Sequence, residues 1–162
     1  MAAMDAAGVS ERATLHLAVG PGIAELERAR LAMLEYLQRA APALGMRSLY
    51  AAELVLEEWV TNVFRHAGGS QVVIELSLAG SAEGQEDSVL QMRFVDDGPA
   101  FDPTQQPEPQ APSSLDEVRP GGLGLLLIRR FASRWSHERI TTREGGRNVM
   151  TVVIGEAGPA QH

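Results

Sequence analysis

The sequence of 162 residues contains no cysteine and no lysine, and each absence excludes a class of chemistry. Without cysteine the chain can form no disulfide, no catalytic thiolate and no cysteine zinc site. Without lysine it has no Walker A phosphate clamp, no strand lysine of a eukaryotic-type kinase and no Schiff base. If the protein binds ATP, it must therefore do so on a different scaffold.

Basic charge and long apolar runs are also scarce. Fourteen basic residues, all arginine, stand against twenty-one acidic ones, so the chain lacks the basic excess of a nucleic-acid-binding protein. No apolar run is long enough to span a membrane, and the first residues lack the layout of a secretory signal. We expect a cytoplasmic protein that contacts neither membrane nor nucleic acid.

The order of the expected elements points to one α/β (α+β) domain. The length suits a single core, and Pro and Gly residues separate the periodic segments. A long segment rich in Pro, Gln and Ser, residues 99–120, predicts either a functional lid or disorder. We expect a two-layer sandwich with a mixed, mainly antiparallel sheet and its helices on one face, from strands at 14–19, 72–78, 90–96, 136–142 and 148–154 and helices at 23–41, 48–67 and 122–134.

Glu58 and Asn62 are four residues apart in the second expected helix, so they share a face. An isolated pair of this kind is most often part of a solvated polar stripe. The alternative is functional: the amide oxygen of Asn62 suits Mg²⁺, and the carboxylate of Glu58 can take a proton from an attacking hydroxyl. Trp59 lies on the apolar face and is expected in the core.

Asp96 continues the inward-facing positions of the strand that ends there. A buried carboxylate needs a partner, because leaving it unpaired costs several kcal/mol. That partner is either structural, such as a loop amide or an arginine, or the exocyclic amino group of an adenine. Gly98, two residues later, would let a ligand approach the backbone closely.

Gly121, Gly122 and Gly124, with Leu123 between them, precede the third expected helix. They form either an ordinary turn or a phosphate site, because free N–H groups and the helix dipole favour anions at a helix start. His66 closes the second helix and is either an end-of-helix residue or part of the same site. The pair Arg129-Arg130 is expected on the solvated edge of its helix.

Three segments, taken in order, resemble the motifs of the GHKL ATPases, and most closely those of bacterial anti-sigma-factor serine/threonine kinases. Residues 58–66 (EWVTNVFRH) resemble the N box, residues 95–103 (VDDGPAFDP) the G1 box, and residues 121–125 (GGLGL) the G2 box. The resemblance covers residues 13–155. It implies a single histidine-kinase-like ATPase domain, flexible tails at 1–12 and 156–162, and an ATP lid at 99–120.

The resemblance also implies roles for single residues. Asn62 would hold Mg²⁺, Glu58 would be the catalytic base, and Asp96 with Gly98 would bind adenine. The other implied ATP-binding residues are His66, Gly121, Gly122, Leu123, Gly124 and Thr151.

The chain departs from the family pattern in three places. Ala100 replaces the last glycine of the G1 pattern, and Arg119 is out of register with an arginine that some relatives use near the terminal phosphate. Gly146-Arg147-Asn148 stands where the family has Gly-Thr, so either Asn148 or Thr151 could assist the adenine site.

Three functions are compatible with this pattern. The first, implied by the resemblance, is a homodimeric anti-sigma factor that phosphorylates a small anti-sigma-factor antagonist with ATP and Mg²⁺. The second is a non-catalytic ATP-binding switch that regulates a protein partner. The third, a detached catalytic domain of a histidine kinase, is disfavoured because the expected helix at 23–41 contains no histidine.

Overall fold

The computed structural model describes residues 14–66, 68–79, 89–105, 114 and 124–155. A five-stranded sheet runs through them in the order β1-β2-β3-β5-β4, and every described pairing is antiparallel. None of the parallel pairs that a mixed sheet would contain occurs among these strands. The strands are β1 (Leu15–Val19), β2 (Val72–Ala79), β3 (Val89–Asp96), β4 (Arg134–Thr142) and β5 (Gly145–Ile154).

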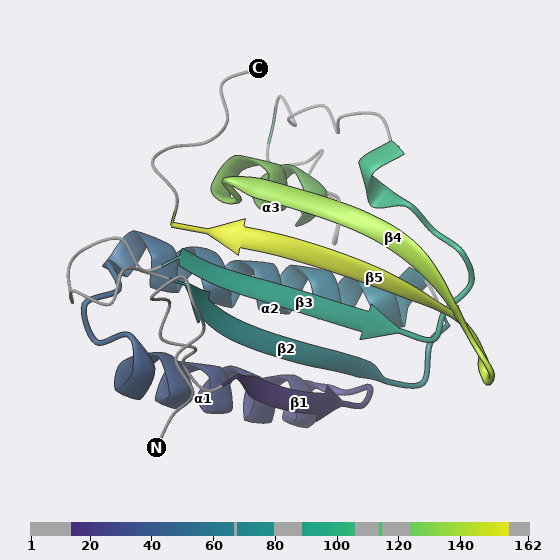
Figure 1. Ribbon diagram of the computed structural model, residues 1–162, viewed down its shortest axis with the longest axis horizontal. Coiled ribbons are helices and arrows are strands. Elements are labelled where there is room, and N and C mark those ends of the chain that lie inside the picture. The colour runs from purple at the N-terminus through teal and green to yellow at the C-terminus, as the bar shows by residue number, and fades with distance from the viewer. Residues whose placement is uncertain (1–13, 67, 80–88, 106–113, 115–123, 156–162) are drawn as a thin grey trace, which may run out of the picture.

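The α-helices of the described residues all lie behind the sheet in the view of Figure 1, which makes the two layers of the predicted α/β sandwich. Gly22, with a φ of 116°, starts α1 in a conformation that other residues rarely adopt. The helices are α1 (Ile23–Ala40), α2 (Met46–His66) and α3 (Gly124–Phe131), and a short 3-10 helix, η1, covers Pro103–Gln105.

The core lies between the two layers, as the periodicity of strands and helices requires. Alternate residues of β3, including Met92 and Phe94, have no exposed surface and face the helices. Trp59 of α2 is 3% exposed, so its predicted place in the core is confirmed. A truncation here would be costly: Phe94→Ala should lose about 3–5 kcal/mol of stability.

Two expectations near α3 need correction. The helix ends at Phe131, not near residue 134, because the backbone N–H of Ser133 already donates to the carbonyl of Val153 at 2.9 Å. Arg129 does not lie on a solvated edge, because its guanidinium stacks over the ring of Trp135, 5.3 Å from the centroid. Its neighbour Arg130 is exposed, as expected.

One row of paired residues crosses the sheet at the end where β3 stops. Asp96 pairs with Val72 on one side and with Asn148 on the other, and Asn148 pairs with Arg139 of β4. Because paired residues share a face, these side chains point to the same side of the sheet as Phe94, toward the helices.

Among the described helices, none combines the length and apolarity that crossing a bilayer requires.

Candidate active site

Glu58 and Asn62 lie side by side on α2, against the first residue of α3. A Cβ atom added to Gly124 would lie 2.7 Å from Glu58 Oε2 and 3.1 Å from Asn62 Nδ2. Gly124 therefore leaves the space that these two side chains occupy. The N box and the last glycine of the segment that resembles the G2 box are therefore neighbours in the structure.

The position of α3 depends on its packing along α2. The rings of Tyr50 and Phe131 meet edge to face, with centroids 6.0 Å apart and planes at 76°. Phe131 ends α3 and contacts the earlier part of α2, whereas Gly124 begins α3 beside Glu58. The two helices therefore run antiparallel along this contact.

Glu58 is half-buried and has no hydrogen bond or ion pair with any residue that the structure describes. Burial raises the pKa of its carboxyl group, the nearby charge of Glu57 raises it further, and Arg65 opposes them. A raised pKa brings a carboxylate closer to the range in which it can accept a proton effectively. This combination of burial and raised pKa is typical of functional sites.

Asp96 is 3% exposed and has structural partners on one of its two oxygens. Oδ1 accepts hydrogen bonds from the backbone N–H of Gly98 and from Asn148 Nδ2, both at 3.0 Å. No described residue hydrogen-bonds to Oδ2, and no arginine pairs with the carboxylate in the described part of the chain. The structural interpretation of Asp96 is therefore confirmed for Oδ1, and binding of a ligand at Oδ2 stays a prediction.

The first residues of the expected lid are tied to the same group. Asn148 is 2% exposed and donates through Nδ2 to the carbonyl of Pro99 at 2.8 Å. Its Oδ1 accepts from the backbone N–H of Phe101 at 3.4 Å. Phe101 itself is 44% exposed, so an aromatic ring lies open next to this group.

Farther along, Asp102 caps η1 and meets a buried histidine. Its Oδ1 accepts from the N–H of Thr104 at 2.9 Å and from the Thr104 hydroxyl at 2.6 Å. His137 Nδ1 of β4 lies 3.6 Å from the same oxygen. The Thr104 bonds, helped by the neighbouring His137, lower the pKa of Asp102. These contacts fasten the start of the 99–120 segment to β4.

Gly69 brings the end of α2 against the end of β3. A Cβ atom at Gly69 would lie 2.9 Å from Asp97 Oδ1 and 3.6 Å from both Gly98 N and Val63 Cγ1. Val63 directly follows Asn62, and Gly98 closes the hydrogen bond to Asp96. The carboxamide of the N box and the free oxygen of Asp96 therefore belong to the same end of the molecule.

Asp97 holds this junction in place. The backbone N–H of Ser70 donates to Asp97 Oδ1 at 2.9 Å, and the Ser70 hydroxyl donates to Oδ2 at 2.5 Å. The same bonds lower the pKa of Asp97, with the hydroxyl contributing most. Both oxygens of Asp97 thus have structural partners.

Asn148 and Thr151 were the two candidates to assist Asp96 in the expected adenine site. The structure places Asn148 next to Asp96, and it does not place Thr151 there. Thr151 pairs with Arg93, one residue out of phase with the row of Asp96, so it lies on the opposite face of the sheet. The expectation that Thr151 lines the site is therefore corrected. A strand places only every second residue on one face, and Asn148 occupies the matching position.

Several predicted residues cannot be placed. Gly121, Gly122, Leu123 and Arg119 lie outside the described residues, as does most of the expected lid. His66 ends α2 at the junction with Gly68 and Gly69, but its side chain is also outside the described set. Their roles remain predictions.

Sequence reasoning missed Arg139. Its Nη1 donates to Asn148 Oδ1 at 2.9 Å and to the carbonyl of Gly98 at 2.8 Å. A signal was available, since β4 and β5 form a hairpin that turns between Thr142 and Gly145. Counting back in pairs from that turn sets Arg139 opposite Asn148.

The residues present fit a nucleotide with its metal. Asp96 Oδ2, which accepts no hydrogen bond from the described residues, suits an amino group, and the amide oxygen of Asn62 suits Mg²⁺. The absence of a side chain at Gly124 lets Glu58 and Asn62 lie against the start of α3. In the described part of the chain, no three His, Cys, Asp or Glu side chains gather into a metal site. Magnesium bound to Asn62 would therefore take most of its other ligands from phosphate and water.

Comparison with known proteins agrees with this geometry. The model of the histidine kinase-like ATPase domain family matches residues 22–154, which include all the described helices and four of the five strands. The chain is 34% identical over 95 residues to the serine/threonine-protein kinase BtrW of Bordetella bronchiseptica. That alignment covers 57% of this chain and 63% of BtrW, which is less than two thirds of the relative. The Glu58–Asn62–Gly124 contact, the half-free carboxylate of Asp96 and the extent of the family match lead to one conclusion: the chain belongs to the histidine kinase-like ATPase domain family.

Proposed function

We propose that this protein is an ATP- and Mg²⁺-dependent serine/threonine protein kinase that acts as an anti-sigma factor. Its substrate would be a serine or threonine hydroxyl on a small anti-sigma-factor antagonist protein. The observation that carries the proposal is the carboxylate of Glu58, half-buried, unpaired among the described residues and next to Asn62 and Gly124. The similarity to a protein named as a serine/threonine kinase supports the same reaction.

In the proposed reaction, the substrate hydroxyl oxygen attacks the terminal phosphorus of ATP. The bond from that phosphorus to the bridging oxygen breaks, ADP leaves with the electron pair, and Glu58 accepts the hydroxyl proton. The raised pKa of Glu58 favours this acceptance. Mg²⁺, held by Asn62, would neutralise phosphate charge, and the remaining contribution of the protein would be positioning.

The base and phosphates would be held by separate parts of the chain. Asp96 would bind the amino group of adenine through Oδ2, with Gly98 shaping that side of the pocket. Gly121, Gly122, Leu123 and Gly124 would line the phosphates, because backbone N–H groups at the start of a helix favour anions. His66 would complete the site from the end of α2.

The proposal places the protein in the cytoplasm as a homodimer with two protein partners, a sigma factor and an antagonist. Sedimentation of the purified chain would test the dimer independently of the chemistry. A single monomeric species at micromolar concentration would contradict the dimer and leave the kinase proposal standing.

The decisive experiment mixes the purified chain with ATP, Mg²⁺ and an anti-sigma-factor antagonist from the same organism. Mass spectrometry of the antagonist should then find one phosphoserine or phosphothreonine. The same mixture with Glu58→Ala should give no product although ATP still binds. Equal transfer by wild type and Glu58→Ala would remove the kinase proposal.

A second candidate, a non-catalytic ATP-dependent switch, is favoured by one observation. Asn148 contacts both Asp96 and the start of the 99–120 segment, at Pro99 and Phe101, so occupancy of the base site could alter a surface used by a partner. In this case partner affinity would depend on ATP and on Asp96, and Glu58→Ala would change nothing.

A further inference from the structure

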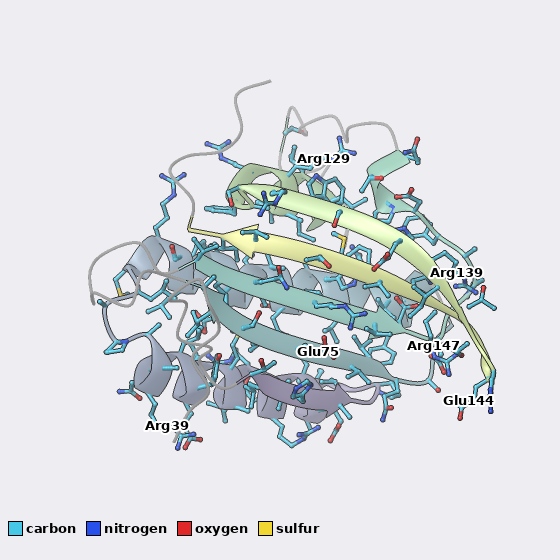
Figure 2. The ribbon with its side chains drawn as sticks, in the orientation of Figure 1. Arg39, Glu75, Arg129, Arg139, Glu144 and Arg147 are labelled. Carbon is cyan, nitrogen blue, oxygen red and sulfur yellow. The ribbon has the colours of Figure 1, made fainter. Side chains whose placement is uncertain are left out.

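Arg139 makes two hydrogen bonds that no motif of the sequence predicts. Through Nη1 it donates to Asn148 Oδ1 at 2.9 Å and to the carbonyl of Gly98 at 2.8 Å. Both acceptors are next to Asp96, one across the sheet and one two residues along the chain. Figure 2 shows Arg139 on β4 near the β4–β5 turn, on the side of the sheet where the 99–105 segment passes.

These bonds decide which way the Asn148 amide faces. Its Nδ2 donates to Asp96 Oδ1 at 3.0 Å and to Pro99 O at 2.8 Å, while its Oδ1 accepts from Arg139. Rotating the amide by half a turn would set its NH₂ against the guanidinium and its oxygen against the carboxylate. Both contacts would be repulsive, so Arg139 on one side and Asp96 on the other together fix a single orientation.

Gly146 provides the space in which the guanidinium of Arg139 lies. A Cβ atom on Gly146 would lie 2.6 Å from Arg139 Nε and 2.7 Å from Cζ, and it would also contact Nη2. Any larger residue at 146 would displace the arginine. The glycine of Gly146-Arg147-Asn148 therefore makes room for Arg139, and Asn148 receives its bond two residues later.

The fixed amide has a direct effect on Asp96. One oxygen, Oδ1, accepts from Gly98 N and Asn148 Nδ2, and these two bonds fix the plane of the carboxylate and so the direction of its other oxygen. Oδ2 is then the acceptor that remains, in one direction, on a side chain only 3% exposed. A donor group on a ligand would satisfy this oxygen, which accepts no hydrogen bond from the described residues.

We propose that Arg139 is a positioning residue for the nucleobase: by fixing Asn148 it holds Asp96 Oδ2 toward a donor on the six-position of the purine. The inference rests on the proposed binding of ATP at Asp96. An amino group at that position donates to the carboxylate, whereas the carbonyl of hypoxanthine or guanine repels it. Arg139 would therefore set the preference for adenine without touching the base.

The test measures binding and does not depend on turnover. ATP and inosine triphosphate (ITP), which differ at the six-position of the base, would be titrated by calorimetry into wild type and Arg139→Met. Loss of Arg139 should weaken ATP binding about tenfold, the scale of one charge-assisted hydrogen bond. Binding of ITP should change less than twofold, so the ratio of the two affinities should collapse toward one.

The β4–β5 hairpin offers a matched control. Arg143 lies in the turn and has no hydrogen bond or ion pair within the described part of the chain. Arg143→Met removes the same charge from the same hairpin and should leave both affinities unchanged. Arg139 is itself exposed, so its replacement does not open the core.

A double-mutant cycle tests whether Arg139 acts through Asn148. In an Asn148→Ala background, Arg139→Met should weaken ATP binding by less than twofold. Gly146→Ala should reproduce the loss of selectivity in a chain that keeps the arginine. Full additivity in the cycle, or an unchanged ATP-to-ITP ratio in Arg139→Met, would overturn the inference.

Asp96→Asn separates this inference from the proposed function. If Asp96→Asn abolishes ATP binding and Arg139→Met does not weaken it, only the role of Arg139 fails. If Asp96→Asn leaves ATP binding unchanged, the proposed nucleotide site itself fails. Circular dichroism of each variant checks that the fold is retained, and Arg139→Lys, which keeps the charge, should restore part of the selectivity.

Discussion

Gly124 contacts Glu58 so closely that a single added methyl group would lie 2.7 Å from its Oε2 atom. The two residues are far apart in the sequence and belong to different helices. Their contact is the structural basis for treating the N box and the G2 box as one site. Replacing Gly124 by alanine would disturb this contact without altering any charge.

Gly124→Ala should lower phosphotransfer at least tenfold, because the new Cβ atom displaces the carboxylate of Glu58 and the amide of Asn62. Both atoms end flexible side chains, so the fold should survive the change. Initial rates of antagonist phosphorylation measure the effect. Gly45→Ala is the control, since no atom lies within 4 Å of a Cβ there, and it should be as active as wild type.

Glu58→Gln should reduce phosphotransfer by about 100-fold or more while ATP affinity stays within threefold of wild type. The substitution keeps the shape of the side chain and removes only its ability to accept a proton. Single-turnover transfer and calorimetric titration of ATP measure the two quantities separately. If affinity fell in parallel with the rate, Glu58 would be a binding residue.

The titration of Glu58 should appear in both rate and stability. Its pKa is raised above the usual 4.5, so the acid limb of the rate profile should lie above pH 4.5 and disappear in Glu58→Gln. Ionisation of Glu58 raises the reaction rate, but it lowers the stability of the fold. The folded state binds this proton more tightly than the unfolded state, so ionisation destabilises the fold.

Wild type should therefore lose stability relative to Glu58→Gln as the pH rises through 4.5, until the folded-state pKa is passed. Because the side chain is only half-buried, the difference should stay below about 1 kcal/mol. Urea unfolding of both proteins between pH 4 and 8 measures it. A wild type that gains stability over this range, relative to the variant, would contradict the raised pKa.

Asp97→Asn should destabilise the protein at neutral pH by about 1 kcal/mol or less, since solvent screens this exposed carboxylate. Hydrogen bonds from Ser70 lower the pKa of Asp97 below 3.8, so its contribution is present above that pH. It is lost as the pH falls through the lower folded-state pKa. The difference in unfolding free energy between wild type and Asp97→Asn should therefore close below pH 3.8.

Ser70→Ala provides the cross-check, because it removes the hydroxyl that donates to Asp97 Oδ2 at 2.5 Å. It should show the same pH dependence as Asp97→Asn. A destabilisation by Ser70→Ala that persisted unchanged at pH 3 would mean that Ser70 acts through something other than the carboxylate.

Helices and strands were predictable from the sequence wherever the spacing of apolar residues and the Gly or Pro residues at the ends of a segment agreed. The second helix was expected over 48–67 and runs over Met46–His66, because its apolar stripe and the glycines after it are both strong signals. The strand expected over 72–78 is Val72–Ala79, since alternating apolar residues fix its inward face. The predicted range of the third helix, 122–134, extends past its end at Phe131. The hydrogen bond of Ser133 to Val153 is a tertiary contact, which helix propensity does not encode.

Single residues of the candidate site were predictable from the sequence, but the contacts between them were not. Glu58, Asn62 and Asp96 were named from spacing and from the position of a strand end. The choice between Asn148 and Thr151 needed the register of β5 against β3, which places Asn148 beside Asp96 and turns Thr151 to the other face. Arg139 entered only through the pairing of β4 with β5.

The sequence by itself determined the residue types: acceptors where an amine or a metal could bind, glycines where a backbone must come close, and no lysine or cysteine for other chemistry. Tertiary structure decided which of these meet. Strand register sets the face and neighbour of each side chain, and helix packing sets Gly124 against Glu58. Both arise from contacts between segments distant in the chain, so they follow from burying one shared core and not from any local pattern.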